Sequence, residues 1–464
     1  MKRLLVCLIL CLTLLAACGE PEPMPVPTAL PPLPTAEPTA VPDPTAVPTA
    51  TPIPLPAPVS GALTVDPALD LGPISPYIYG TNYGPMQAVP LEMMPLVLDA
   101  GFTTLRYPAG AWTDEVDIKP FQLDQFVDFY NQFGALPTVS VRLKNGTAET
   151  AAMLVAYANI VKGYGIEYWS IGNEPTLFAE QMNEEYDTER LNREWRAIAL
   201  AMKAVDPTIK LIGPELHQWG IDPSSTLKDS AGRDWMDEFL KVNGDLVDVV
   251  SVHRYPLWKP SGQEVTIDEL RANLPEWNKL VTYLEQVTKE ITGRDLPVAF
   301  TEVNSSPTGV LGQPASPDAF FNAIWYADVL GRMMDQDVFM VNQWVMSQRS
   351  TGLGLIFGNE TRPTLYTFYM YRHFGNQQRF AASGVENVRI YAAQRDDGAL
   401  TLMVINLGDE TVTAPLQIQG MSPTNAQIYL LDATHNAEDL GTQSWPADGV
   451  VTLPGQSVIL FVIE

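Results

Sequence analysis

The stretch of sequence that decides the fold is IEYWSIGNEP, residues 166–175. Its apolar, β-branched and aromatic residues predict a short strand buried on both faces of a parallel sheet, with Glu174 just past its end. A second stretch of the same kind, LPVAFTEVNSS (296–306), places Glu302 in the same position. Barrels built from parallel strands carry their catalytic groups at the carboxyl ends of the strands. The two stretches therefore predict a pair of carboxylates across one cleft.

Eight apolar runs of this kind alternate with helical patterns from about residue 76 onward. The predicted strands are 77–82, 103–109, 136–143, 167–174, 209–216, 247–255, 297–304 and 339–346. Helices are predicted over 147–165, over 186–207 with a stop at Asp206-Pro207, and over 316–334 with a Ser-Pro-Asp start. Strands that alternate with helices predict a parallel sheet, and eight units over roughly 300 residues favour a (β/α)8 barrel. No glycine-rich phosphate loop follows the first strand, which argues against a dinucleotide-binding fold.

After about residue 376 the pattern changes to short strands separated by turns. These strands are predicted over 387–394, 399–406, 413–419, 426–432, 449–454 and 457–464, with no helix between them. The predicted fold class is therefore α/β, a (β/α)8 TIM barrel over residues 61–375 with a C-terminal antiparallel β-sandwich over residues 376–464. Residues 62–70, ahead of the first barrel strand, are a candidate extra strand of this sandwich.

The amino terminus, MKRLLVCLILCLTLLAAC (1–18), has a basic start and an apolar stretch that is short for a membrane span. It ends in LAAC (15–18), which resembles the bacterial lipobox, so residues 1–18 are predicted to be a lipoprotein signal peptide with lipidation at Cys18. The alternative is an ordinary secretory signal in which Cys18 is incidental. Residues 19–60 are predicted to form a disordered stalk, because 15 prolines lie between residues 21 and 58.

Charge and cysteine content exclude several classes of function. The net charge of −26 argues against nucleic acid or anionic lipid as a partner. The three cysteines are Cys7, Cys11 and Cys18, so no cysteine follows the predicted lipidation site. The folded part is therefore expected to have no disulfide and no thiol chemistry. We also expect a monomer.

Four strand ends share a recognisable set of motifs: IGNEP on the fourth strand, TEVN on the seventh, a histidine and tyrosine pair on the sixth and a tryptophan on the eighth. Together they resemble the clan A retaining glycoside hydrolases. The opening ISPYIYGTN (74–82) resembles family 44, whereas AGFTTLRYPAGAW (100–112) is closer to families 39, 51 and 79. Ala109 stands where those relatives often have glycine, so the exact family stays open.

The resemblance implies a role for each matching residue. Glu174 matches the acid/base and Glu302 the nucleophile, which would cleave a glycosidic bond with retained configuration in two displacements. Asn173 matches the residue that contacts the sugar 2-hydroxyl, and Arg106 matches the cation that keeps the nucleophile ionised. The remaining positions expected to contact the nucleophile or the sugar are His253, Tyr255, Trp344 as a stacking platform, Asn82 and Tyr83. No organic cofactor and no metal are implied.

Two further stretches are more ambiguous. GPELHQWG (213–220) follows the fifth strand, and its Glu215 and His217 are candidates for lining a subsite. The acidic run TDEVD (113–117) could bind calcium, but it lacks EF-hand spacing, so a solvated loop is expected instead.

The function predicted from the sequence is a surface-anchored, extracytoplasmic glycosidase that acts on a plant or microbial polysaccharide or oligosaccharide. One alternative is a non-catalytic, glycan-binding lipoprotein on the same scaffold. Another is a solute-binding lipoprotein of a transporter, which would require two open-sheet lobes with a hinge. The sequence leaves open which sugar is recognised and whether cleavage is endo or exo.

Overall fold

The computed structural model describes residues 55–85, 87–259, 263–307, 311–348 and 352–464. All of them belong to one compact unit, Leu55–Glu464. The predicted signal peptide with Cys18, and residues 19–54 of the predicted stalk, lie outside the described residues. None of the described helices combines the length and the apolar character that a membrane span needs.

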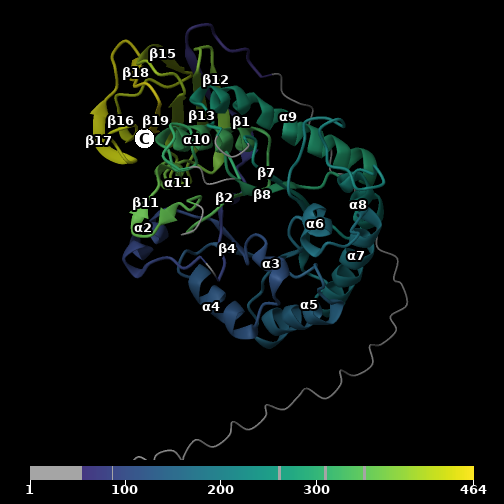
Figure 1. The fold of residues 1–464 in the computed structure, drawn as a ribbon. Helices are drawn as coiled ribbons and strands as arrows, with labels where there is room; N and C mark the ends of the chain where they lie inside the picture. Colours follow the sequence, from purple (N-terminus) through teal and green to yellow (C-terminus); the bar gives the residue numbers. More distant parts are fainter. Residues whose placement is uncertain (1–54, 86, 260–262, 308–310, 349–351) are drawn as a thin grey trace, which may run out of the picture. The chain divides into compact units, whose positions relative to one another are not determined.

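A closed barrel of eight parallel strands confirms the main fold prediction (Figure 1). The strands pair in chain order, and β9 returns to pair with β2. Each predicted run contains one observed strand, but most of the strands are shorter than predicted because their last residues turn into loops at the carboxyl ends. The strands are β2 Tyr77–Asn82, β3 Thr104–Tyr107, β4 Leu136–Val141, β5 Tyr168–Ile171, β6 Lys210–Leu216, β7 Val249–Arg254, β8 Val298–Val303 and β9 Met340–Gln343.

Helices surround the barrel (Figure 1). The longer ones are α4 Pro120–Tyr130, α5 Ala148–Val155, α7 Thr188–Val205, α8 Trp235–Asn243, α9 Ile267–Thr292, α10 Phe320–Asp335 and α11 Pro363–Tyr371. Shorter ones are α2 Met94–Asp99, α3 Trp112–Glu115 and α6 Phe178–Met182, and α5 continues as a π-helix over Ala156–Val161. As predicted, α7 stops before Asp206. Helix α10 begins four residues later than predicted, because Ser316 closes a turn with Gln313 and Asp318 instead.

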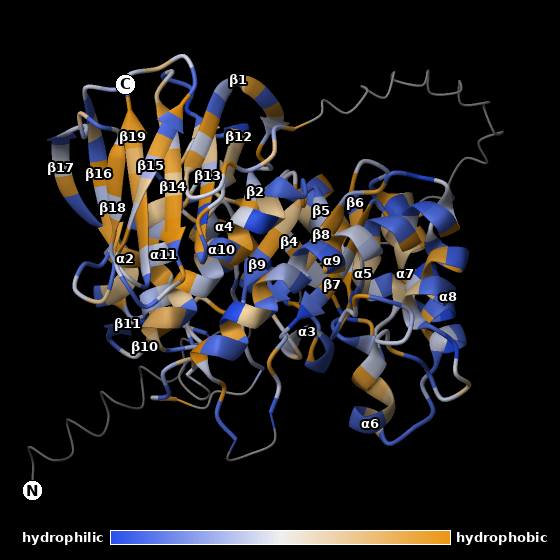
Figure 2. Ribbon diagram, turned by 90° about the horizontal axis from the view of Figure 1, so that it is seen from above, coloured by the Kyte–Doolittle hydropathy of each residue, from blue (hydrophilic) through white to orange (hydrophobic). Residues whose placement is uncertain are grey.

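The second layer is a curled β-sheet of nine strands, in the order β17-β16-β19-β14-β13-β12-β1-β15-β18. Apolar side chains of both halves of the sheet form one core, so the sheet closes on itself as a sandwich (Figure 2). Strand β1, Leu63–Pro73, pairs antiparallel with β12 and parallel with β15. The others are β12 Gln377–Ser383, β13 Val388–Gln394, β14 Leu400–Asn406, β15 Val412–Ile418, β16 Asn425–Leu431, β17 Glu438–Ser444, β18 Val450–Leu453 and β19 Ser457–Ile463.

Helix α10 lies between the barrel and the sandwich and fixes one to the other. All of its residues from Phe321 to Met334 are buried. The Tyr391 hydroxyl of β13 donates to Asp328 of α10 at 2.6 Å, and the Tyr391 ring lies directly over Gly331. Because this contact leaves no room for a side chain at Gly331, the sandwich packs tightly against the barrel.

Candidate active site

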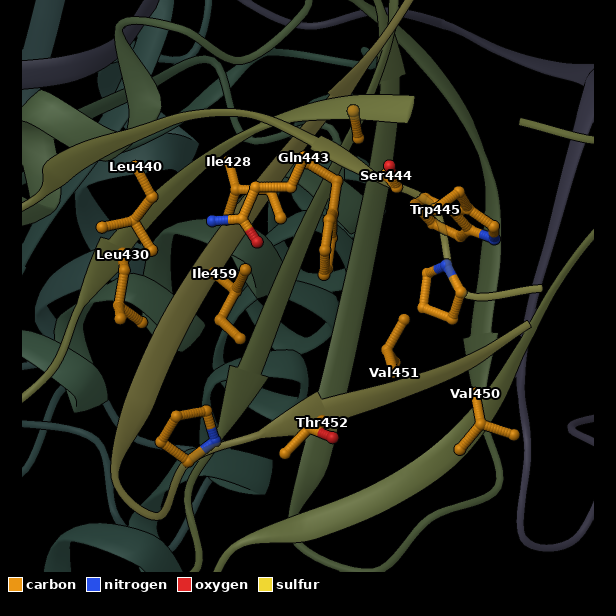
Figure 3. A pocket seen from close by; sticks show the side chains of 14 residues that line it. Ile428, Leu430, Leu440, Gln443, Ser444, Trp445, Val450, Val451, Thr452 and Ile459 are labelled. Atoms are coloured by element: carbon orange, nitrogen blue, oxygen red, sulfur yellow. The ribbon is translucent and has the colours of Figure 1, made fainter. Parts of the chain in front are cut away.

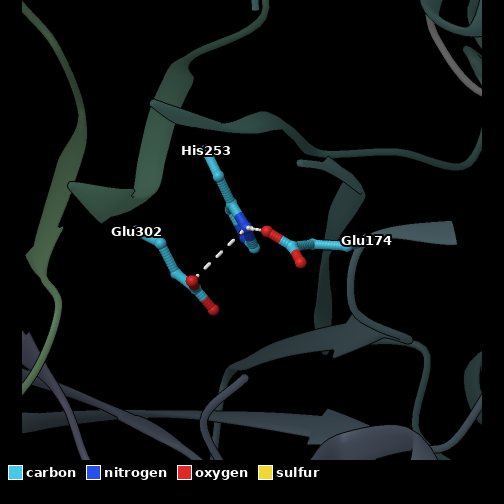
Figure 4. A group of neighbouring side chains, drawn as sticks. All are labelled: Glu174, His253 and Glu302. Carbon is cyan, nitrogen blue, oxygen red and sulfur yellow. Dashed lines mark hydrogen bonds and ion pairs between the residues drawn. The ribbon is translucent and has the colours of Figure 1, made fainter. Parts of the chain in front are cut away.

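Glu174 and Glu302 lie together at the carboxyl ends of the fourth and seventh barrel strands, β5 and β8. Glu302 is the fifth residue of β8, whereas Glu174 follows β5 in a left-handed turn with a φ of 52°. The backbone N–H of Glu174 donates to the Glu215 carbonyl at 3.0 Å, which fixes this turn. One oxygen of each carboxylate and a ring nitrogen of His253 all lie within 4.8 Å of one another (Figure 4).

Both oxygens of Glu302 are held by hydrogen-bond donors. The Arg106 guanidinium of β3 donates to Oε1 at 2.9 Å, and the Tyr255 hydroxyl donates to Oε2 at 2.8 Å. The side chain is only 5% exposed, whereas that of Glu174 is 20% exposed. Glu302 is therefore a fixed, enclosed carboxylate, and Glu174 is the more accessible member of the pair.

Arg106 also orients two amide side chains that the sequence placed at the site. It donates from Nη1 to Asn82 at 2.9 Å and from Nη2 to Asn173 at 2.8 Å. The Asn82 side-chain amide in turn donates to the Thr301 carbonyl at 3.0 Å. The side-chain N–H₂ of Asn173 has no hydrogen bond to any described residue, so it is the donor that remains for a ligand.

His253 lies beneath the pair, with each ring nitrogen facing a different carboxylate. Nδ1 lies 2.9 Å from Glu174 and 3.6 Å from Glu302, and Nε2 lies 3.0 Å from Glu215. Burial opposes a charge on the ring, but the three carboxylates outweigh it and raise the pKa of His253 to about 9. The surrounding carboxylates therefore favour the charged form of His253.

Burial acts on both glutamates of the ligand-free site, with opposite outcomes. Burial raises the pKa of Glu302, and the charge of Glu174 adds to this effect. Burial also acts on Glu174, but the hydrogen bond and the charge of His253 outweigh it and lower the pKa of Glu174. Each carboxyl therefore depends on the state of the other, and their contacts, more than their resting charges, distinguish their roles.

Asp114 corrects the expectation of a solvated acidic loop at residues 113–117. Its carboxylate is buried in α3 and accepts three backbone hydrogen bonds, from Leu143 and Lys144 at 2.8 and 2.9 Å and from Asn173 at 2.7 Å. Burial raises the pKa of Asp114 to about 6 in spite of these bonds. This side chain therefore anchors the backbone directly before Glu174, a role that charge spacing alone did not reveal.

Trp344 follows β9 and packs its ring against Gly110 of the loop after β3. A Cβ at position 110 would come within 3.1 Å of Trp344 Cζ3 and closer still to Cη2. The Trp344 carbonyl accepts from Asn304 and Gln343, both at 2.6 Å. The ring thus packs against the loop after β3, and the backbone that carries it is bonded to side chains at the ends of β8 and β9.

The structure does not bring every predicted residue into this cluster. The Tyr83 ring stacks on Phe129 of α4, with centroids 4.3 Å apart, and this contact directs it toward the helix layer. His217 remains beside Glu174, where its Nδ1 lies 2.6 Å from the Thr176 hydroxyl. Burial lowers the pKa of His217, so this ring is a neutral hydrogen-bonding group.

Glu215 was a candidate for subsite lining, and the structure places it elsewhere. Its side chain is completely buried beneath His253 and Arg106. A φ of 61° at this residue turns the end of β6 inward. The cluster therefore contains a third carboxylate that no ligand can reach.

The nitrogen and oxygen atoms of Glu174, His253 and Glu302 lie close enough together to hold a metal ion. However, His253 already faces Glu174, and the Arg106 guanidinium is ion-paired with Glu302. Two of the three side chains therefore already face protein cations.

A separate cavity of about 300 Å³ opens inside the sandwich between β16, β17 and β18 (Figure 3). Its lining is largely apolar and includes Ile428, Leu430, Trp445 and Val451. No carboxylate lines it, so this cavity contains no acid–base pair.

Comparison with known proteins supports the resemblance to glycoside hydrolases that the sequence motifs indicated. Residues 149–350 match the family described as glycosyl hydrolases family 39, and residues 386–458 match the C-terminal immunoglobulin-like domain of D-apionate lactonase. The chain is 23% identical over 326 residues to an intracellular exo-alpha-(1->5)-L-arabinofuranosidase of Streptomyces lividans, with 51% of this chain and 47% of that protein covered. It is 24% identical over 331 residues to endoglucanase A of Paenibacillus lautus, with 60% and 45% covered.

The chain spans about half the length of these two relatives. Among solved structures, an alpha-L-arabinofuranosidase from Thermotoga maritima in complex with arabinose superimposes with a TM-score of 0.68 at 19% identity, covering 87% of this chain and 99% of that one. At this identity the similarity shows the fold. The barrel, the carboxylate pair and the match over residues 149–350 make this chain similar to glycosidases, as the sequence predicted.

Proposed function

We propose that the protein is a retaining glycosidase that cleaves a plant or microbial polysaccharide or oligosaccharide by double displacement. The observation that carries the proposal is the short separation of the two carboxylates, whose nearest oxygens lie within 4.8 Å. Retaining enzymes place the two carboxyl groups about 5 Å apart, whereas inverting enzymes separate them by about 6.5 to 9.5 Å to admit a water.

The contacts of each glutamate support its role. Glu302 is fixed through both oxygens, as a nucleophile aimed at one carbon atom must be, and Arg106 stabilises its ionised form. Glu174 has one oxygen on His253, while the other has no hydrogen bond to a described residue and can face a glycosidic oxygen. Glu302 therefore attacks the anomeric carbon while Glu174 protonates the leaving oxygen, and Glu174 then deprotonates the water that releases the sugar.

Substrate binding also favours the protonated form of Glu174, which the first displacement requires. In the ligand-free site, His253 favours the ionised form of Glu174. A glycosidic oxygen that accepts a hydrogen bond from Glu174 favours the protonated form instead. The bound sugar thus shifts the proton of the coupled pair toward the acid, with Asn173 as the donor that remains for its 2-hydroxyl.

Substitution of each glutamate tests the proposal. Glu302→Gln and Glu174→Gln should each lower turnover of activated aryl glycosides by roughly a thousandfold or more. Added azide should restore activity only to the Glu174 variant, because azide replaces the water that Glu174 activates. Glu194→Gln, which alters an ion pair with Arg190 on α7, is the control. Activity near that of the wild type in either active-site variant would overturn the assignment.

The cellular context is a second part of the proposal. The lipobox-like LAAC and the proline-rich stretch support a lipoprotein anchored outside the cytoplasm through Cys18, with a stalk between the anchor and the enzyme. Cys18→Ala should abolish incorporation of radiolabelled palmitate and release the protein from the membrane fraction. A wild-type protein that takes up no palmitate would refute the anchor and leave the proposed chemistry unaffected.

A further inference from the structure

Glu215 is a completely enclosed carboxylate of the site. Its side chain has no exposed surface and lies on the fifth barrel strand, below the two glutamates. Oε2 lies 3.0 Å from His253 Nε2 and 3.5 Å from Arg106 Nη2, and it also accepts from the Thr301 hydroxyl. A buried carboxylate is stable only when charges and donors compensate it, and here both cations of the site do so.

The backbone of Glu215 connects it to Glu174. Its N–H is hydrogen-bonded to the Ser251 hydroxyl at 3.1 Å, and its carbonyl accepts from the Glu174 N–H at 3.0 Å. A φ of 61° is unusual for a glutamate and costs of order 1 kcal/mol. Because of this turn, the side chain of Glu215 lies beneath His253 while its backbone is bonded to Glu174.

The geometry of His253 requires a proton on each ring nitrogen when its neighbours are ionised. Nδ1 faces Glu174 and Nε2 faces Glu215, and an ionised carboxylate only accepts hydrogen bonds. A neutral imidazole has a single N–H and would satisfy one of these contacts. The titratable and charged groups around the ring are Glu174, Glu215, Glu302, Arg106, His217 and Tyr255.

A count of charges shows what Glu215 adds. Two cations, Arg106 and the imidazolium, face three carboxylates, so the cluster carries one surplus negative charge when all three are ionised. Without Glu215, only Glu174 and Glu302 would face the ring, at 2.9 and 3.6 Å, and the two cations would hold both of them ionised. Because Glu215 adds a third negative charge, Glu174 can accept the hydrogen bond from His253 and still take up a proton.

We propose that Glu215 is a positioning residue that holds His253 doubly protonated, so that Nδ1–H orients Glu174 for its work as acid and base. This inference rests on the proposed function of Glu174. Glu215 touches neither the sugar nor the reacting atoms, and it acts entirely through His253. This positioning role gives a reason for a carboxylate in a part of the barrel that no ligand reaches.

The test is a ¹⁵N NMR titration of His253 in the full-length protein without substrate. The chain contains four histidines, so single-residue variants assign the spectrum. In the wild type, both ring nitrogens of His253 should be protonated at pH 7. In Glu215→Gln, the pKa of His253 should fall by about 1 to 3, because one opposite charge within 4 Å is lost. The alkaline limb of the kcat/KM profile should move to lower pH by the same amount.

Asp328→Asn is the matched control, because Asp328 is equally buried and ion-paired, with Arg332 at 2.7 Å, but lies in α10. It should leave the titration of His253 unchanged. A wild-type His253 that is neutral at pH 7 would overturn the inference even if Glu215→Gln failed to fold, and so would an unchanged titration in a folded Glu215→Gln. Because the titration needs no substrate, an inactive wild type with a charged His253 would refute the proposed function alone.

Discussion

The contact between Gly110 and Trp344 provides a sharp test of the sugar platform. A methyl group at position 110 would lie 3.1 and 3.2 Å from Trp344 Cζ3 and Cζ2 and closer to Cη2, where ordinary contact begins at 3.4 Å. The ring of Trp344 must therefore move by about 1 Å in Gly110→Ala, and a displacement of that size at a substrate-positioning group can cost about 100-fold in rate.

Backbone strain must be separated from this displacement, and Gly134 makes that possible. Gly110 and Gly134 share a φ of 63°, so alanine costs about 1 to 2 kcal/mol of unfolding free energy at either position. A Cβ at position 134 meets nothing within 4 Å. Both variants should therefore lose similar stability in urea titrations.

The assay is kcat/KM on an activated aryl glycoside, measured for both variants where both are fully folded. Gly110→Ala should lose about 10- to 100-fold, whereas Gly134→Ala should match the wild type. Equal activity of the two variants would refute the role of Trp344 as a platform, because the ring would then have moved without consequence.

Three further changes test other parts of the account. Tyr255→Phe removes a hydrogen bond to an ionised carboxylate and should lower kcat by about 10- to 100-fold in steady-state assays; an unchanged kcat would mean that Glu302 needs no second donor. Asp114 has a folded pKa of about 6, above its unfolded value of 3.8, so its contribution to stability falls as the pH rises between these values. Asp114→Asn abolishes this decline and should gain about 2 kcal/mol relative to the wild type between pH 4 and pH 7 in urea unfolding; a constant difference would contradict the raised pKa. Gly331→Ala drives a methyl group into the Tyr391 ring and should cost about 1 to 3 kcal/mol of stability with little change in kcat, whereas a neutral effect would mean that the sandwich is loosely docked.

The barrel could be predicted because its strands are buried on both faces and therefore read as apolar runs. The sandwich strands β12 and β17 could not, since their sequences QQRFAAS and EDLGTQS are mostly polar and half-buried or exposed. Strand β17 exists because it pairs with β16 at the edge of the sheet. Pairing across the chain, and not local pattern, determines such strands.

The residues of the site also divide into those that could be predicted from the sequence and those that could not. Glu174, Glu302, Arg106 and Tyr255 could be predicted because each lies at the end of a recognisable strand. Glu215 and Asp114 could not be assigned correctly, because their roles depend on burial and on backbone N–H groups from other segments. Nothing in the sequence indicates the left-handed turn at Glu215, because glutamate is not a residue that favours this conformation.

The central claim is that Glu302 is the nucleophile, and trapping of the covalent intermediate tests it most directly. A panel of activated 2-deoxy-2-fluoro glycosides is offered to the wild-type enzyme, and the labelled protein is digested and mapped by mass spectrometry. We expect one sugar per chain, attached to the peptide that carries Glu302, and no label in Glu302→Gln. A label on Glu174 or Glu215, or hydrolysis of the parent glycoside that inverts the anomeric centre, would contradict it.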